Sequence, residues 1–200
     1  MRAPAGESRA PVMMAVGDSF TVGSGPVPAW QSYAAAAART LRWQPVIAGA
    51  GGTGFVSRGR VGRNFRESFE AELAWRPAPD VLIISGGHND RRWSTQHVRR
   101  AASSLLWLAR AQWPRTRIVV IGPIWLDTPP PGASRVRDAL AEVAGREGVT
   151  FLDAMAQRWI TGDPAAVMLP DGVHPTRGGH ARIAAWLVDS LAKAGFTAPA

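Results

Sequence analysis

The chain of 200 residues contains no cysteine. This absence excludes disulfides, zinc–thiolate sites and cysteine nucleophiles, although it leaves the cellular compartment open. Long apolar runs are missing too, and none approaches the roughly 18 residues that a transmembrane helix needs. The first eleven residues, MRAPAGESRAP, lack the apolar core of a signal peptide. We therefore expect a cytoplasmic protein without a membrane span, although a secreted chain whose leader had been removed would look the same.

Lysine is almost absent, because Lys193 is the only one, and arginine supplies nearly all of the positive charge. The formal net charge is +8 at pH 7, and a basic surface can attract nucleic acid or anionic substrates. However, the arginines are scattered and form no tract longer than a pair. Origin in an arginine-rich proteome explains such a composition without a nucleic-acid partner. We expect no nucleic-acid partner, and a basic nucleic-acid-binding module is the non-enzymatic alternative.

Short apolar runs with the composition of buried strands recur along the chain. They span residues 12–16, 45–48, 81–84, 118–121 and, more weakly, 149–152. Helical patterns lie between and after them, at residues 30–41, 65–74, 95–113, 135–147 and 176–194. Unbroken β-branched runs are typical of a parallel sheet that is covered on both faces. This alternation predicts an α/β protein, a three-layer α/β/α sandwich with a five-stranded parallel sheet.

The chain length suits one domain with a complete core. No linker or internal repeat interrupts the alternation, so we expect a single catalytic domain over residues 11–196, after a flexible segment at residues 1–10. Ligands of open α/β sheets bind outside the carboxyl ends of the strands. Any chemistry is therefore expected in the segments that immediately follow the strands.

The first strand ends in the sequence GDSF, which leaves the Ser19 hydroxyl at the start of a turn into a helix. Free backbone N–H groups and the helix dipole favour negative charge there, as a nucleophilic serine requires. The same position suits an ordinary helix cap. Ser19 is a nucleophile only if other segments supply a base, an orienting acid and an oxyanion site.

The segments after the second and third strands offer hydrogen-bond donors. In GAGGTG, residues 49–54, Gly51 is the best candidate for a backbone N–H donor to an oxyanion, and a tight turn is the alternative. In SGGHND, Asn89 carries an amide of the kind that stabilises oxyanions, although asparagine is also common in turns. His88 would be badly placed as a base so close to these donors, so we interpret it as structural or substrate-shaping.

The sequence DGVHP precedes the last helix, and Pro175 disfavours helical geometry at His174. Through such a turn, the Asp171 carboxylate can reach one imidazole nitrogen of His174 and leave the other to accept a proton. The pair could instead bind a metal, but no convincing third ligand accompanies it, and we expect His180 to lie on a helix surface. We therefore expect neither a metal nor another cofactor.

Together, GDSF with Ser19, the glycine-rich block with Gly51, GGHND with Asn89, and DGVHP with Asp171 and His174 resemble the SGNH (GDSL-type) hydrolase family. The resemblance spans nearly the whole chain, whose size is similar to that of compact bacterial members. It implies a flavodoxin-like fold in which Ser19 is the nucleophile and His174 the base, oriented by Asp171. It also implies an oxyanion hole formed by the Ser19 and Gly51 N–H groups and the Asn89 side chain.

One position departs from the family pattern, and in one segment the alignment with the family motif is ambiguous. Phe20 stands where the family name has leucine, and the glycine-rich block could be aligned with Gly49 or Gly52 in place of Gly51. The other common serine-hydrolase motif, G-x-S-x-G, is absent from the sequence.

The substrate is expected to be a small-molecule ester. Trp125, in the loop after the fourth strand, either lines an acyl or sugar pocket or packs over a helix. Trp93 follows two arginines and could contact an anionic or carbohydrate leaving group. No long apolar lid is visible, so we expect a serine esterase for small or carbohydrate-linked acyl groups that works through an acyl-serine. An acyltransferase using the same intermediate is the alternative.

Overall fold

The structure is a computed structural model, and it describes residues 9–196. The flexible segment expected at residues 1–10 lies almost entirely outside the described residues. The strands are β1 (Val12–Gly17), β2 (Gln44–Gly49), β3 (Val81–Ser85), β4 (Arg117–Ile121) and β5 (Thr150–Leu152). All neighbouring strands pair in parallel, in the order β2-β1-β3-β4-β5. The predicted five-stranded parallel sheet is confirmed.

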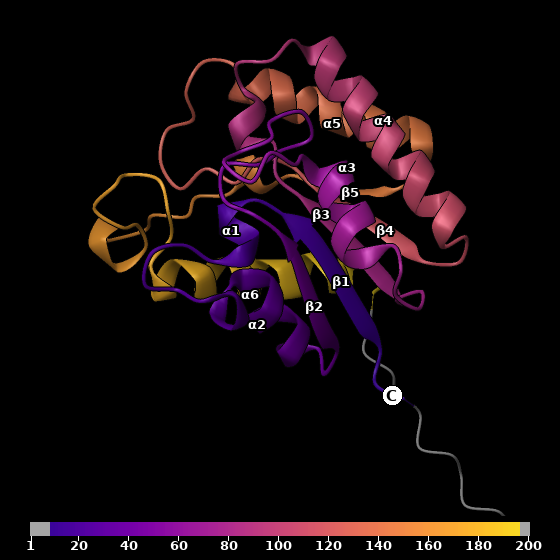
Figure 1. Ribbon diagram of the computed structural model, residues 1–200. Coiled ribbons are helices and arrows are strands. Elements are labelled where there is room, and N and C mark those ends of the chain that lie inside the picture. The colour runs from indigo at the N-terminus through magenta and orange to yellow at the C-terminus, as the bar shows by residue number, and fades with distance from the viewer. Residues whose placement is uncertain (1–8, 197–200) are drawn as a thin grey trace, which may run out of the picture.

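Helices cover both faces of this sheet (Figure 1). One face is covered by α1 (Ser19–Val22), α2 (Tyr33–Thr40) and α6 (Arg177–Lys193), and the other by α3 (Phe65–Ser68), α4 (Thr95–Gln112) and α5 (Ala133–Glu147). A π-helical stretch, Phe69–Leu73, continues α3, and short 3-10 turns lie at Ala29–Gln31, His88–Asp90, Ala154–Ala156 and Pro164–Ala166. Within the described residues, no helix is both long and apolar enough to cross a membrane.

Two hydrophobic cores, one on each side of the sheet, explain why the strand sequences are apolar without alternation. Successive strand side chains point to opposite faces. Met13 and Ala15 of β1 therefore enter the core beneath α2 and α6, whereas Met14 and Val16 enter the core beneath α4 and α5. Both sets are buried, so no position in the middle of β1 tolerates a polar side chain.

The helices begin and end close to the predicted bounds, with two informative differences. The helix expected from residue 30 begins at Tyr33, because Ala29–Gln31 forms a separate 3-10 turn and Ser32 has extended backbone geometry. The helix expected at residues 65–74 changes from α to π hydrogen bonding at Phe69. Its start is fixed by a capping box in which the Asn64 side chain and Glu67 satisfy each other's backbone N–H groups.

The strand order creates a switch point at β1. The chain reaches β2 on one side of β1 through α2, and then crosses to β3 on the other side through α3. Gly17 at the end of β1 lies level with Gly49 of β2 and Ser85 of β3. The loops that follow these strands therefore start side by side, at the place where open α/β sheets bind ligands.

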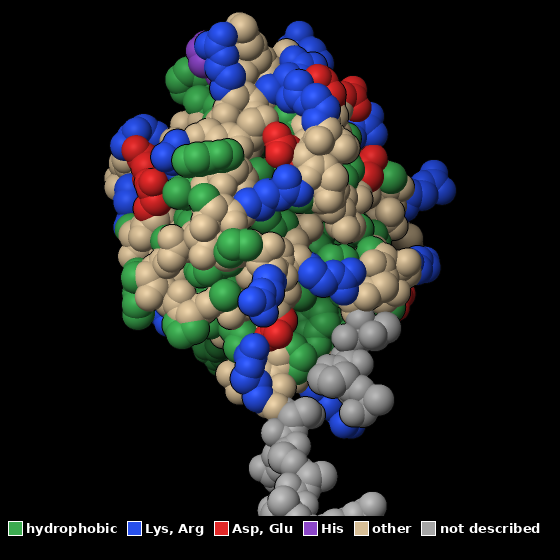
Figure 2. Space-filling model, turned by 90° about the vertical axis from the view of Figure 1, so that its right-hand side faces the viewer, with side chains coloured by type: hydrophobic (Ala, Val, Ile, Leu, Met, Phe, Trp, Pro, Cys, Tyr) green, Lys and Arg blue, Asp and Glu red, His purple; other side chains and the backbone are tan. Residues whose placement is uncertain are grey.

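The opposite end of the sheet faces the viewer in Figure 2. On this face the basic side chains lie among acidic, apolar and other groups and do not form one continuous basic surface. Several of the arginines of the molecule are paired with carboxylates, as in Arg99–Glu142 and Arg110–Glu147.

Candidate active site

Ser19 is the first residue of α1, directly after the carboxyl end of β1. The Asp18 side chain caps this helix by accepting the Phe20 N–H at 3.0 Å. Gly17 lets the chain turn here, because a Cβ at this position would collide with the Thr21 hydroxyl and the Ser85 carbonyl oxygen. Ser19 itself makes no cap contact, so its hydroxyl is available for another partner.

That partner is His174, which lies 155 residues away in the sequence. Ser19 Oγ lies 3.0 Å from His174 Nε2, and His174 Nδ1 lies 2.6 Å from Asp171 Oδ2. The carboxylate therefore accepts a hydrogen bond from the Nδ1–H group, which leaves Nε2 of the neutral ring as an acceptor for the serine hydroxyl. A hydroxyl, an imidazole and a carboxylate are therefore in one hydrogen-bonded row.

Asp171 also fixes the turn that carries His174. Its Oδ1 accepts the backbone N–H groups of Val173 and His174, each at 2.9 Å. Burial acts to raise the pKa of Asp171, but the hydrogen bonds from the His174 ring and from these N–H groups outweigh it and lower the pKa to about 2. The carboxylate is therefore ionised throughout the neutral range and holds both the ring and its backbone.

Gly51 lies next to Ser19, since a Cβ built on it would be 3.7 Å from Ser19 Cβ. Gly49 belongs to β2, and its N–H points to Glu72 Oε2 at 3.4 Å. Gly51 and Gly52 both line the cavity at Ser19, and Gly49 does not. Of the three glycines that the sequence leaves open, Gly49 is therefore the one whose N–H is directed away from the serine.

Asn89 lies in the 3-10 turn after β3 and uses one amide N–H to hold the neighbouring loop, donating from Nδ2 to the Thr53 carbonyl at 2.9 Å. A primary amide has a second N–H. The Ser57 hydroxyl in turn donates to the Asn89 carbonyl at 2.8 Å. These bonds join the loop after β2 to the loop after β3, so that the two candidate oxyanion donors are held by one network.

The residue that organises this network, Asp90, was missed by the sequence analysis. It is completely buried, and its carboxylate accepts the backbone N–H groups of Phe55 at 2.7 Å, Val56 at 3.1 Å and Ser57 at 2.9 Å. Gly54 is required beside it, because a Cβ there would overlap the carboxylate. The sequence offered only an aspartate in a turn, and nothing local indicates that its partners are 33 to 35 residues away.

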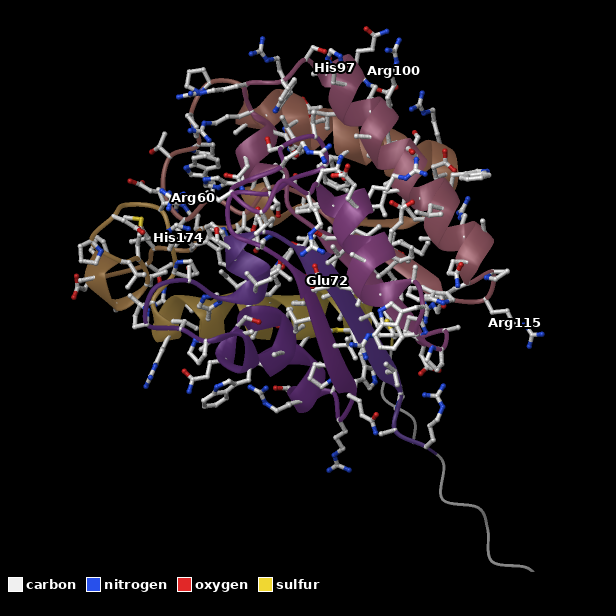
Figure 3. The ribbon with its side chains drawn as sticks, in the orientation of Figure 1. Arg60, Glu72, His97, Arg100, Arg115 and His174 are labelled. Carbon is white, nitrogen blue, oxygen red and sulfur yellow. The ribbon has the colours of Figure 1, made fainter. Side chains whose placement is uncertain are left out.

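A cavity of about 550 Å³ opens at the serine. Its lining consists of Ser19, Gly23, Ser24, Gly51, Gly52, Gly59, Arg60 and His174. No apolar side chain is among them. In Figure 3, Arg60 and His174 lie together at the end of the molecule where the strands terminate.

None of the three predicted substrate contacts lines this cavity. His88 is buried and stacks flat on Trp125, with ring centroids 3.8 Å apart. The Phe20 ring contacts both His88, at 5.5 Å, and His174, at 5.8 Å. Trp93 borders a different cavity, formed with Arg91, Arg92 and Arg135. His88, Trp125 and Trp93 as substrate contacts remain predictions.

Burial changes the protonation of His88. Desolvation lowers its pKa to about 4 and outweighs the hydrogen bond to the Ile124 carbonyl, which acts to raise the pKa, while the charges of Arg91 and His174 lower it by smaller amounts. The ring is therefore neutral at neutral pH.

His180 corrects a prediction, because it is 1% exposed and does not lie on the helix surface. Its Nδ1 accepts the Tyr33 N–H at 3.1 Å, and its ring stacks against the Tyr33 ring. It stands on the buried face of α6, one turn before Ile183 and two before Leu187, which are both in the core. This helical spacing was visible in the sequence and could have identified it.

We expect His180 to make the protein sensitive to acid. Burial, and to a lesser extent the charge of His174, lowers its pKa from 6.5 to about 4. Between pH 6.5 and 4, His180 becomes protonated in the unfolded chain but stays neutral in the folded chain. The free energy of unfolding therefore falls as the pH drops toward 4, by at most about 1.4 kcal/mol per pH unit. His180→Asn keeps an acceptor for the Tyr33 N–H but does not titrate, and should make the pH dependence shallower in urea unfolding at pH 4.5 to 6.5.

The exposed His97 provides the control, since His97→Asn should leave the slope unchanged. Every protein in this comparison retains Asp18, which titrates in the same pH range. Its pKa is raised to about 7, chiefly by burial and also by the charge of Asp90, so it stabilises the fold as the pH falls through the same range. Equal slopes for the wild type and His180→Asn would contradict the prediction.

No group of three or more histidine, aspartate or glutamate side chains suited to a metal ion occurs in residues 9–196. Asp171 contacts His174, and His174 contacts Ser19. The arrangement brings together a hydroxyl, an imidazole, a carboxylate and amide donors, which is the set of groups used in acyl transfer.

Comparisons with known proteins agree with this chemistry. The model of the GDSL-like lipase/acylhydrolase family matches residues 15–182. A GDSL lipase of Mycobacterium tuberculosis is 30% identical over 182 residues, covering 84% of this chain and 76% of that protein.

Solved structures share the fold at low sequence identity. A carbohydrate acetylesterase from Sinorhizobium meliloti superimposes with a TM-score of 0.73 at 18% identity, over 92% of this chain and 99% of its own. A salicylyl-acyltransferase from a tetracycline biosynthetic pathway has a TM-score of 0.73 at 21% identity, over 94% of this chain and 56% of its own.

Proposed function

The chain belongs to the GDSL-like lipase/acylhydrolase family and is an enzyme of this SGNH hydrolase type, and from this premise we propose that it is a serine esterase acting through an acyl-serine intermediate. The observation that carries the proposal is the hydrogen-bonded row of Ser19, His174 and Asp171, with separations of 3.0 Å and 2.6 Å. These distances are within the range required for direct proton transfer between the serine and the base.

In the first half of the reaction, Ser19 Oγ attacks the ester carbonyl carbon while its proton passes to His174 Nε2. The ring becomes a cation, which the adjacent Asp171 carboxylate stabilises. The carbonyl oxygen becomes an oxyanion, which accepts hydrogen bonds from the Ser19 and Gly51 N–H groups and from the second amide N–H of Asn89. Loss of one such donor typically costs about 3 kcal/mol of transition-state stabilisation.

Collapse of this intermediate breaks the bond to the alcohol, which leaves with the proton from His174 Nε2. Water then attacks the acyl-serine, giving its proton to His174, and the carboxylic acid is released as Ser19 regains its hydrogen. The Asp171 and His174 side chains are 47% and 28% exposed. Water can therefore reach the base, which favours hydrolysis over transfer of the acyl group to another alcohol.

The lining of the cavity limits the substrate. The lining consists of glycines, serines, Arg60 and His174, so no aliphatic side chain extends along the cavity to pack against a long acyl chain. We therefore propose short acyl groups, although the relative from Mycobacterium tuberculosis is called a lipase. Acyl groups carried by carbohydrate are included, since a protein with the same fold is named a carbohydrate acetylesterase.

A fluorophosphonate probe tests the assignment of the nucleophile. Such a probe should label the protein once, and peptide mass spectrometry should find the label on Ser19, in parallel with loss of p-nitrophenyl acetate hydrolysis. Ser19→Ala should prevent labelling, whereas Ser103→Ala, on α4, should be labelled like the wild type. A label on another serine would refute the proposal.

A further inference from the structure

The loop between β2 and α3 carries three arginines within six residues, and only one of them lines the cavity at the serine. Arg58 pairs with Glu67 at 2.8 Å, and Arg63 pairs with Glu72 at 3.3 Å. Arg60 forms no ion pair with any residue in the described part of the chain, and it lines the cavity that contains Ser19. Its two neighbours are used to hold the loop on α3 and the stretch after it, whereas Arg60 is left facing the site.

The backbone of the loop fixes where Arg60 starts. Thr53 and Arg58 form an isolated antiparallel bridge, which folds residues 58–60 back onto residues 51–53. Gly59 packs so closely that a Cβ on it would lie 2.8 Å from the Gly51 carbonyl oxygen. Gly59 also has a φ of +56°, which favours glycine. The residue before Arg60 is therefore held against the peptide that flanks the candidate oxyanion donor.

The charge of the cavity is one-sided. Its lining contains Arg60 and no aspartate or glutamate. The nearby Asp171 carboxylate is already occupied by the His174 ring and by two backbone N–H groups. Arg60 and His174 appear side by side in Figure 3, far from the exposed Arg115 at the other end of the molecule. A guanidinium without a counter-charge beside a nucleophile is suited to a carboxylate or phosphate, which it can bind through two parallel hydrogen bonds.

From these observations we propose that Arg60 determines specificity by binding an anionic group of the ester substrate. This inference rests on the proposed esterase function and adds the substrate class: esters with a carboxylate or phosphate in either the alcohol or the acyl part. Arg60 does not take part in bond making, and its effect is on the choice between charged and neutral esters.

Two pairs of esters test the inference, and each pair differs only in one negative charge. For the alcohol part, 4-acetoxybenzoate is compared with its methyl ester. For the acyl part, the mono-4-nitrophenyl ester of adipic acid is compared with its methyl ester. The quantity measured is the ratio of kcat/KM for the charged ester to kcat/KM for the neutral one, in wild type and variants at fixed ionic strength.

We expect Arg60→Gln to lower this ratio roughly 10- to 100-fold for at least one pair, the usual effect of losing a hydrogen bond to a charged group. The pair that responds identifies the part of the substrate that carries the charge. Arg60→Glu should reduce the ratio further. Arg58→Gln and Arg63→Gln remove the same charge from the same loop and should change the ratio less than about twofold, since an exposed charge outside the cavity is largely screened.

The outcomes separate this inference from the proposed function. If the wild type hydrolyses none of the four esters and is not labelled by the fluorophosphonate probe, the esterase function itself is wrong. If it hydrolyses them, but Arg60→Gln changes neither ratio or changes it no more than Arg58→Gln and Arg63→Gln do, Arg60 has no role in specificity and only this inference is overturned.

Discussion

Replacement of His174 by alanine is expected to lower kcat for p-nitrophenyl acetate by on the order of 10⁴- to 10⁶-fold. The reason is that Nε2, 3.0 Å from Ser19 Oγ, is the group that we propose to accept the serine proton. The residual activity will come from the oxyanion donors and substrate binding. Stopped assays over hours, with protein purified from a host that lacks competing esterases, can measure this loss.

Three further variants distinguish loss of a base from damage to the fold. Ser19→Ala should reduce kcat by a similar factor, and the double variant Ser19→Ala/His174→Ala should be scarcely slower than either single one, because the two groups act as a unit. His97→Ala removes an exposed imidazole and should retain full activity. If the loss of activity in the double variant equalled the product of the two single losses, the serine and the histidine would be acting independently. The proposed proton transfer from Ser19 to His174 would then be wrong.

The second large effect is expected for Asp90→Ala, which should lower the free energy of unfolding by about 3 to 5 kcal/mol. The substitution removes one buried carboxylate that accepts three backbone N–H groups, from Phe55, Val56 and Ser57. These three N–H groups would lose the acceptor that they have in the structure. Urea unfolding monitored by circular dichroism gives the difference.

Gly54→Ala is an independent route to the same conclusion. Its methyl group would be forced into the Asp90 carboxylate, so we expect a loss of similar size without any change of charge. Asp127→Ala, at an exposed aspartate, should shift stability by less than about 0.5 kcal/mol. A loss below about 1 kcal/mol for both Asp90→Ala and Gly54→Ala would show that the loop does not depend on this carboxylate.

Asp90 also explains why the candidate oxyanion donors can be rigid although they lie on glycine-rich loops. Asn89 is bonded to Thr53, and Ser57 is bonded back to Asn89, so the two loops move together. Because the Asp90 carboxylate holds the loop after β2 in this network, we expect Asp90→Ala to reduce kcat as well as the free energy of unfolding.

Much of the fold was determined by the sequence alone. The runs that became β1, β3 and β4 are buried on both faces, so they had to be apolar along nearly their whole length, and such runs are readable without knowledge of what packs on them. The motif residues Ser19, Gly51, Asn89 and His174 could be assigned to one edge for a related reason. Parallel strands place all their carboxyl ends together, so the order of elements already fixes the edge on which the loops meet.

Only the tertiary structure decided which side chains meet within that edge. The contact between Ser19 and His174 spans 155 residues, and the bonds of Asp90 span more than 30. His88 and Trp125 stack on each other and do not line the cavity at the serine, whereas Arg60 lines it while Arg58 and Arg63 pair with carboxylates. Such outcomes depend on how loops from distant parts of the chain pack against one another. Local composition does not specify that packing, because the same turn residues can adopt many conformations until long-range contacts select one.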